Sequence, residues 1–210
     1  MHYLTKEILF PNVNEANQDG LLAIGGDLSV ERLLLAYKLG IFPWFENDEP
    51  ILWWSPDPRF VLFPEKLKVS KSMKQVLRNS SFKVTINKAF DEVIYQCSII
   101  KRNGQAGTWI SKSMINAYTK LHELGHAKSV EVWKNENLVA GFYGIDLGNI
   151  FCGESMFTKT SNASKIGLIT FIQNSNYKLI DCQVYTQHLE SLGGEDIPRT
   201  KFLEYLNSTD

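Results

Sequence analysis

Phe151-Cys-Gly-Glu-Ser-Met-Phe157 and Leu179-Ile-Asp-Cys-Gln183 are two apolar segments that each carry a carboxylate where a hydrophobic core begins. Both are typical of β-strands, and a predicted helix from Ser161 or Asn162 to about Gln173 joins them. Burying a carboxylate is costly unless it is paired or takes part in chemistry. Glu154 and Asp181, at the ends of two strands that are close together in the sequence, therefore predict a cleft. Two satisfied structural carboxylates are the alternative interpretation.

The rest of the C-terminal part also alternates between helices and strands. The predicted strands are Lys83–Ile86, Ser129–Trp133, Leu138–Ile145, Ile150–Cys152 and Lys178–Val184, and further helices are expected after caps at Ser70, Asn87 and Ser111 and at Pro198. The helix after Ser111 carries its apolar face on Met114, Tyr118, Leu121 and Leu124. Asn135-Glu-Asn137 predicts a hairpin turn. Together these elements predict an α/β fold of the α+β type with a mixed sheet.

The first segment of the chain, to about residue 60, is rich in turns and aromatic residues. It carries one clear helix, which Ser29 caps and which ends at Gly40. Prolines at positions 43, 50, 56 and 58 then interrupt regular structure. We therefore expect a small N-terminal domain at residues 1–62 and a larger domain at residues 63–210.

Composition excludes several classes of protein. With 210 residues, of which 44% are hydrophobic, the chain can bury a sizeable core. Three widely spaced cysteines without a Cys-x-x-Cys pair argue against a disulfide framework. His122 and His126 are separated by the helix-ending Gly125 and lack an evident third ligand, so no metal site is expected. A signal sequence and long apolar runs are missing, which predicts a cytoplasmic protein without a membrane span.

Charge is distributed unevenly along the chain, although the formal net charge is only −1. Residues 1–50 hold eight acidic and three basic side chains, a net charge of −5. Residues 59–88 hold eight basic side chains against Glu65 alone, a net charge of +7. A cluster of that size can attract a phosphate backbone. An ordinary solvated face is the alternative interpretation.

Eight short motifs follow one another along the chain. They are Gly25-Gly-Asp-Leu-Ser29, Gly40-Ile-Phe-Pro-Trp44, Trp53-Trp-Ser-Pro-Asp-Pro-Arg59, Gly107-Thr-Trp-Ile110, Leu121-His-Glu-Leu-Gly125, Gly153-Glu-Ser-Met-Phe157, Asn162-Ala-Ser-Lys165 and Asp181-Cys-Gln183. In this order they resemble the bacterial leucyl/phenylalanyl-tRNA–protein transferase family. The resemblance covers about residues 19–200.

The resemblance implies a fold and an activity. The larger domain is expected to have an acetyltransferase-like fold. The implied reaction moves Leu, Phe or Met from aminoacyl-tRNA to the N-terminal Arg or Lys of a protein, which creates an N-degron for protein degradation. No cofactor is expected, because the ester of the donor is already activated. The implied partners are charged tRNA and the acceptor protein, and nothing in the sequence demands more than a monomer.

The resemblance also implies three catalytic residues: Asp181, Gln183 and Glu154. Asp181 and Gln183 are two residues apart on a predicted strand, so their side chains should share a face and Cys182 should face the core. Asp181 either orients the Gln183 amide to accept a proton from the acceptor amine or pairs electrostatically with the cationic acceptor. Glu154 binds either the α-ammonium of the donor or the cationic side chain of the acceptor. The sequence leaves these alternatives open.

Three groups of residues match the family's binding positions. The aminoacyl side-chain pocket corresponds to Phe142, Phe151, Leu168, Phe171 and Ile180, and the adenosine platform corresponds to Tyr37, Trp44 and Trp109. The acceptor stem of the tRNA would be held through its phosphates by Lys66, Lys68, Lys71, Lys74 and Arg78. Trp53 and Trp54 are interpreted as packing between domains, with Arg59 bonded to a local carboxylate.

Two positions depart from the family pattern. Phe142 stands where a smaller or more flexible residue is expected, which can narrow the donor preference, and Lys128 stands where His is expected. Two other functions are alternatives. An acyl-CoA N-acetyltransferase should carry a pyrophosphate-binding loop, which this sequence lacks. A non-catalytic RNA-binding module would explain the basic segment but would leave Glu154 and Asp181 without a role.

Overall fold

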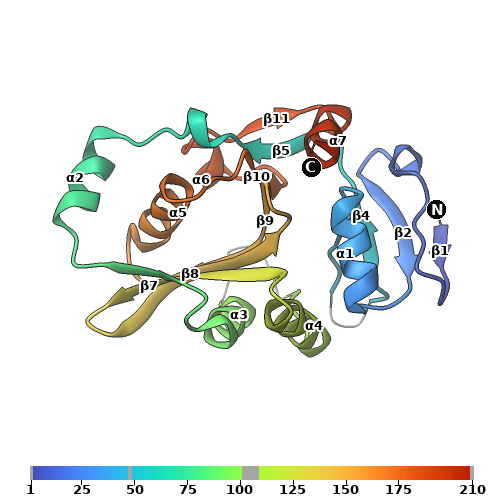
Figure 1. The fold of residues 1–210 in the computed structure, drawn as a ribbon, viewed down its shortest axis with the longest axis horizontal. Coiled ribbons are helices and arrows are strands. Elements are labelled where there is room, and N and C mark those ends of the chain that lie inside the picture. The colour runs from blue at the N-terminus through green and yellow to red at the C-terminus, as the bar shows by residue number, and fades with distance from the viewer. Residues whose placement is uncertain (1, 47–48, 101–108, 209–210) are drawn as a thin grey trace.

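The computed structural model describes residues 2–46, 49–100 and 109–208. Its larger sheet has seven strands in the order β11-β5-β10-β9-β8-β7-β6 (Figure 1). These strands are β5 (Arg59–Leu62), β6 (Lys83–Ile86), β7 (Ala127–Lys134), β8 (Asn137–Asp146), β9 (Ile150–Thr158), β10 (Leu179–Gln183) and β11 (Glu195–Ile197). Only β9 and β10 run parallel, and every other neighbouring pair is antiparallel. The predicted mixed α/β fold is confirmed.

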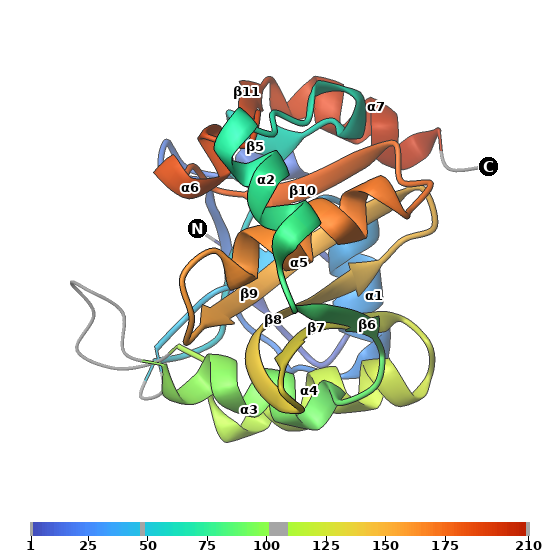
Figure 2. The ribbon, with the colours of Figure 1, turned by 90° about the vertical axis from the view of Figure 1, so that its left-hand side faces the viewer.

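Helices cover both faces of this sheet. They are α2 (Lys71–Asn79), α3 (Phe90–Ile99), α4 (Lys112–Glu123), α5 (Ala163–Gln173), α6 (Gln187–Glu190) and α7 (Arg199–Asn207). α5 packs on one face, whereas α3 and α4 pack on the opposite face (Figures 1 and 2). One core cluster lies between the sheet and α5, and Met73 of α2 joins it. The sheet thus forms the middle layer of a three-layer arrangement.

The N-terminal part forms a separate four-stranded sheet in the order β1-β2-β4-β3. Its strands are β1 (His2–Leu4), β2 (Leu21–Gly25), β3 (Phe42–Pro43) and β4 (Leu52–Trp54), and α1 (Val30–Lys38) packs beside them. Two 3₁₀ turns, η1 (Val13–Glu15) and η2 (Pro64–Lys66), complete the described elements. A second core cluster joins this sheet to α3, α4 and α7, so the two parts share one hydrophobic interior.

Several local predictions are confirmed. The hydroxyls of Ser70 and Ser111 accept hydrogen bonds from the backbone N–H groups of Met73 and Met114, each at 3.1 Å, and cap α2 and α4. The turn between β7 and β8 has positive φ at Asn135 (49°) and Glu136 (64°), as a tight hairpin requires.

Other local predictions are wrong. Asn87 does not cap α3, because its side chain accepts a hydrogen bond from the Ser129 backbone N–H at 3.0 Å and the helix starts three residues later. Leu124 is not part of the buried face of α4: it is the C-cap residue, beyond the helix end, and is exposed. β9 continues to Thr158, so Glu154 lies within a strand and not at its end.

The division at residue 62 stays a prediction. β5 (Arg59–Leu62) pairs with β10 and β11 in the larger sheet, so the chain enters this sheet a few residues before the predicted boundary. Trp53 is fully buried against Phe10, with ring centroids 4.9 Å apart, and its indole N–H donates to the Gly25 carbonyl oxygen at 2.9 Å. Trp53 thus belongs to the interior of the small sheet.

Candidate active site

Two irregularities in the larger sheet bring the candidate catalytic residues together. The register of β8 against β9 shifts between Tyr143 and Gly144, which leaves Glu154 as the extra residue of a bulge. A Cβ atom at Gly144 would lie 2.2 Å from the Cys152 carbonyl oxygen, so only glycine fits opposite this bulge. Bulges re-aim side chains and are frequent beside active sites. Glu154 is turned in this way out of the strict alternation of β9.

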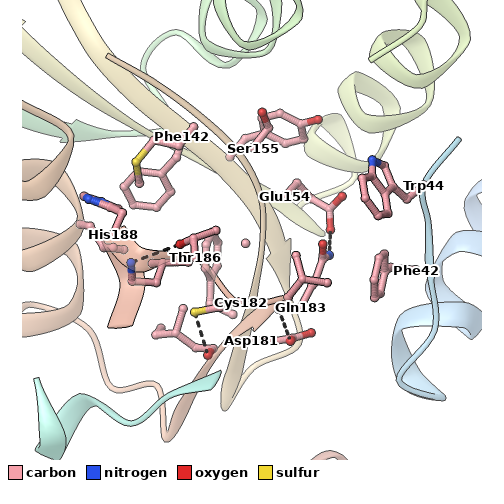
Figure 3. A pocket seen from close by; sticks show the side chains of 18 of the residues that line it. Phe42, Trp44, Phe142, Glu154, Ser155, Asp181, Cys182, Gln183, Thr186 and His188 are labelled. Atoms are coloured by element: carbon pink, nitrogen blue, oxygen red, sulfur yellow. Dashed lines mark hydrogen bonds between the residues drawn. The ribbon is translucent and has the colours of Figure 1, made fainter. Parts of the chain in front are cut away.

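The second irregularity lies at the end of β10. The register of β10 against β5 shifts between Asp181 and Gln183, and Gln183 has a φ of +64°, a left-handed conformation that is uncommon for this residue type. The parallel pairing of β9 with β10 stops at Asp181 and Cys152. Beyond that point the side chains of Glu154 and Gln183 face one another (Figure 3).

Asp181 is completely buried and is held by Arg59 of β5. The guanidinium donates from Nε to Oδ1 at 2.8 Å and from Nη2 to Oδ2 at 2.7 Å, a bidentate ion pair. Oδ1 also accepts the backbone N–H of Gln183 at 2.9 Å. Asp181 therefore contacts the backbone of Gln183 and not its side-chain amide, which differs from the expected relay. Arg59 is bonded to a carboxylate as expected, but this partner is distant in the sequence.

Glu154 is the centre of a hydrogen-bond network. Its Oε1 accepts from Gln183 Nε2 at 2.7 Å, and its Oε2 accepts from the hydroxyl of Tyr118 at 3.0 Å. The hydroxyl of Tyr118 in turn makes a short hydrogen bond with the hydroxyl of Tyr37. The network connects β9 to β10, α4 and α1. Neither the bulge nor these tyrosine contacts could be deduced from sequence spacing.

The environment of Glu154 favours its protonated form. Burial raises the pKa of this carboxyl from its usual range to about 8, and the hydroxyls of Tyr37 and Tyr118 and the amide of Gln183 act in the opposite direction. Burial also raises the pKa values of Tyr37 and Tyr118, which stay neutral. A carboxyl that titrates near the pH at which an amine must be deprotonated suits general base catalysis.

A first prediction concerns stability as a function of pH. Between the ordinary pKa of a glutamate and about pH 8, folded Glu154 keeps a proton that unfolded Glu154 has lost. Its contribution to the free energy of unfolding therefore falls as the pH rises through this window and levels off above about 8. We therefore expect the Tm of Glu154→Gln, relative to the Tm of the natural chain, to increase as the pH rises from 6 to 9. Glu190→Gln, at an exposed carboxylate, is the control; equal pH profiles for all three proteins would contradict the prediction.

The network lies beside an apolar pocket of about 390 Å³. Four of the five predicted side-chain pocket residues line it: Phe142, Phe151, Leu168 and Ile180. Phe171 packs behind them, with its ring centroid 4.8 Å from that of Phe151. In Figure 3, Phe142 and His188 lie toward one end, Trp44 and Phe42 toward the other, and Glu154 and Gln183 between them. The pocket thus joins an apolar end to an aromatic end through a polar centre.

The aromatic end agrees with only part of the predicted adenosine platform. Trp44 and Trp109 line the pocket, and Trp44 is 41% exposed, so its ring is available for stacking. Tyr37 is wrongly placed in this group: its ring is buried, and its hydroxyl faces Tyr118. Phe42 lines the same region and is absent from the predicted platform. Its place in the Gly40-Ile-Phe-Pro-Trp44 motif was the available signal.

Comparison with known proteins identifies the family. A model of the "Leucyl/phenylalanyl-tRNA protein transferase" family matches residues 61–207, and a model of its N-terminal domain matches residues 26–57. The chain belongs to the leucyl/phenylalanyl-tRNA–protein transferase family. The match of two models also confirms the expected small N-terminal domain.

Relatives of that name match along almost the whole chain. The protein from Flavobacterium johnsoniae is 61% identical, over 99% of this chain and all of its own. The protein from Klebsiella pneumoniae is 53% identical, over 95% of this chain and 87% of its own. Among solved structures, a GCN5-related N-acetyltransferase from Kribbella flavida shows 10% identity over 78% of this chain and 59% of its own, with a TM-score of 0.36. A likeness this distant does not place the chain among the acetyltransferases.

The basic residues expected to hold tRNA in this transferase family are exposed. Lys71, Lys74 and Arg78 lie on α2, and Lys68 precedes that helix. Lys66 forms an ion pair with Glu195 of β11, which neutralises part of its charge. Lys128, the departure from the family pattern, forms an ion pair with Asp146 at 2.5 Å and donates to the Tyr177 hydroxyl at 3.2 Å. Lys128 therefore has a structural partner.

Cys182 and His122 were the other residues considered for chemistry, and the structure gives the surroundings of both. Cys182 packs against the core cluster beside α5, as expected, and also lines the pocket; burial raises the pKa of its thiol, so it is not a thiolate nucleophile. His122 stacks on Phe90 and bonds through Nδ1 to the Ala127 carbonyl oxygen at 2.8 Å.

Across residues 2–46, 49–100 and 109–208, no cluster of potential metal ligands occurs. Within the same ranges no helix is long and apolar enough to cross a membrane.

Proposed function

We propose that this chain catalyses the transfer of leucine, phenylalanine or methionine from aminoacyl-tRNA to the N-terminal Arg or Lys of a protein. The observation that carries the proposal is the hydrogen-bonded pair of Glu154 and Gln183 at the polar centre of an apolar pocket. Membership of the transferase family supports the same reaction. The product would carry a destabilising N-terminus and would enter protein degradation as an N-degron.

Glu154 is proposed as the general base. An acceptor ammonium has no lone pair, so it must lose a proton before its nitrogen attacks the ester carbonyl carbon. In the proposed reaction, ionised Glu154 takes that proton, the C–N bond forms, and the bond to the ribose oxygen breaks. Glu154 passes this proton to the leaving ribose oxygen, and the nitrogen releases its second proton to solvent as the peptide bond forms. The products are a peptide bond and uncharged tRNA, and Glu154 returns to its starting state.

Gln183 and Asp181 are proposed to position the acceptor amine. Because Gln183 Nε2 donates to Glu154, the amide oxygen is left to accept a hydrogen bond from the incoming amine. Asp181 fixes the strained backbone of Gln183, and Arg59 neutralises and holds Asp181. This arrangement supports a positioning role for Asp181, in place of either the direct relay or the electrostatic contact with the acceptor.

The remainder of the donor is assigned along the pocket. Its apolar end takes the aminoacyl side chain by size and desolvation. Trp44 and Trp109 are proposed to stack on the terminal adenosine, as aromatic side chains do with any base.

The donor ester is already activated, so the proposed reaction needs no cofactor. Charged tRNA is made where translation occurs, which supports a cytoplasmic location, and all assigned groups come from one chain, which supports a monomer.

A second prediction concerns donor preference. Phe142 is 4% exposed and lines the pocket, with its ring centroid 5.5 Å from that of Phe171. Phe142→Ala should enlarge the apolar end and raise the ratio of kcat/KM for phenylalanyl over leucyl donors about tenfold. The two donors are to be compared on the same acceptor peptide. Phe82→Ala, at a half-buried phenylalanine outside the pocket lining, is the control, and an unchanged ratio in Phe142→Ala would remove this residue from the specificity pocket.

A third prediction concerns tRNA. Lys71→Gln/Lys74→Gln should weaken binding of charged tRNA and lower the slope of log K against log salt by about 0.7–0.9 for each phosphate that α2 no longer neutralises. Lys38→Gln/Lys201→Gln removes the same charge from exposed positions elsewhere on the chain. Binding is to be measured by filter retention at several salt concentrations. Equal slopes for the two double variants would show that α2 does not bind phosphates.

The proposed function is tested by transfer of radiolabelled leucine or phenylalanine from charged tRNA. The acceptors are peptides that begin with Arg, Lys or Ala and are otherwise identical. We expect label on the Arg and Lys peptides only. Charged tRNA that binds without any transfer would overturn the enzymatic function and leave an RNA-binding protein.

A further inference from the structure

We infer that Tyr118 and Tyr37 form a positioning pair for the catalytic carboxylate, by which the N-terminal helix α1 and α4 hold Glu154 in its working orientation. The inference rests on the proposed role of Glu154 and extends it to two residues outside the pocket lining. Its basis is the series of hydrogen bonds from the Tyr37 hydroxyl to the Tyr118 hydroxyl, and from there to Glu154 Oε2 at 3.0 Å.

The two hydroxyls can serve either protonation state of the carboxyl. Ionised Glu154 only accepts hydrogen bonds, so Tyr118 must donate to it and accept from Tyr37. When Glu154 holds a proton, each hydroxyl can rotate, so that Glu154 donates to Tyr118 and Tyr118 donates to Tyr37. A general base gains and loses a proton in every turnover. The pair therefore keeps Oε2 bonded throughout the cycle, which a donor-only group could not do.

The pair is also rigid. Tyr37 is 1% exposed and Tyr118 is fully buried, and the ring of Tyr118 packs edge-on against Tyr143 with centroids 5.5 Å apart. Both phenols are neutral, because burial raises their pKa values. With Oε2 held from this side and Oε1 held by Gln183, the carboxylate plane is fixed relative to the pocket. Groups fixed by buried hydrogen bonds give the precise geometry that catalysis needs.

The effect of the Tyr118 hydroxyl on the ionisation of Glu154 can be measured, because the other groups around the carboxyl stay the same in the variants. The groups that act on Glu154 are Tyr37, Tyr118, Gln183 and Asp181, and Arg59 neutralises Asp181. The thiol of Cys152 lies within their influence as well, and burial keeps it protonated. Tyr118→Phe removes one donor to the carboxylate and leaves these other groups in place. Removal of a donor to a charged acceptor disfavours its ionised form.

The test is the pH dependence of kcat for transfer to one Arg-peptide between pH 6 and 9. Tyr118→Phe should move the acidic limb upward by about one pH unit and lower kcat at pH 7 about tenfold, with KM for charged tRNA unchanged. Tyr37→Phe should shift the limb in the same direction. Tyr177→Phe, which removes another mostly buried hydroxyl with a hydrogen bond, should leave the limb in place. Because the acceptor amine is the same throughout, its own titration cancels between variants.

The outcomes separate this inference from the proposed function. If Tyr118→Phe does not fold and shows no thermal transition, Tyr37→Phe serves as the test in its place, because it keeps the hydrogen bond from Tyr118 to Glu154. If the natural chain transfers amino acids and both Phe variants keep its pH profile, the positioning pair is wrong and the transferase stands. If the natural chain transfers nothing, the proposed function itself fails.

Discussion

Glu154→Gln should lower kcat for aminoacyl transfer about 10²–10⁴-fold, the range that general base catalysis contributes. The substitution keeps the shape of the side chain and its capacity to hydrogen-bond Gln183 and Tyr118, but it cannot accept a proton from the acceptor amine. Because the carboxylate is not assigned to tRNA binding, the affinity for charged tRNA should stay within about twofold. Single-turnover transfer and filter binding on the same preparation measure the two quantities.

The controls for this variant exclude indirect effects. Glu190→Gln makes the same change at an exposed carboxylate that accepts a hydrogen bond from the Tyr185 hydroxyl and lies outside the pocket lining. It should transfer at the natural rate. Full activity of Glu154→Gln would show that the amine arrives already neutral, and Glu154 would then be a binding group only. A parallel loss of tRNA affinity would instead assign Glu154 to the donor.

The sequence predicts the local parts of this fold well. Ser70 and Ser111 cap their helices because a hydroxyl at the N-cap bonds a backbone N–H only three residues away. The Asn135–Glu136 turn is likewise a property of adjacent residues. The four-residue strand β5 is not predicted, because it follows a proline-rich segment and is too short to show periodicity. Features that depend on adjacent residues can therefore be predicted from the sequence, whereas the strands that pair with one another cannot.

The site shows the same division. Glu154, Asp181 and Gln183 are predicted from apolar strands that carry a carboxylate, and from resemblance. Their working contacts depend on bulges, in which one strand carries an extra residue against its partner, as Glu154 does opposite Gly144. The partner of Asp181 lies 122 residues away. One signal was available: Arg59 directly precedes Phe-Val-Leu, and an arginine at the start of an apolar strand needs a buried anion.

Arg59→Met should destabilise the fold by about 3–5 kcal/mol, the typical cost of leaving one member of a buried ion pair without its partner. Arg59 is 1% exposed and Asp181 is completely buried, so water cannot take the place of the guanidinium. The double variant Arg59→Met/Asp181→Leu removes both charges, and pairs of this kind are often replaced by apolar residues at little cost. It should therefore recover most of the stability that the single variant loses, measured by urea unfolding.

The activity of the double variant separates structure from catalysis. Without Asp181 the backbone N–H of Gln183 loses its acceptor, and the left-handed conformation of this residue is no longer enforced. We expect the double variant to be folded yet to transfer at least tenfold more slowly, because a misplaced positioning group costs rate even where the fold survives. A double variant as active as the natural chain would contradict the positioning role. The ion pair would then serve only to fill the interior, and the orientation of Gln183 would depend on Glu154 alone.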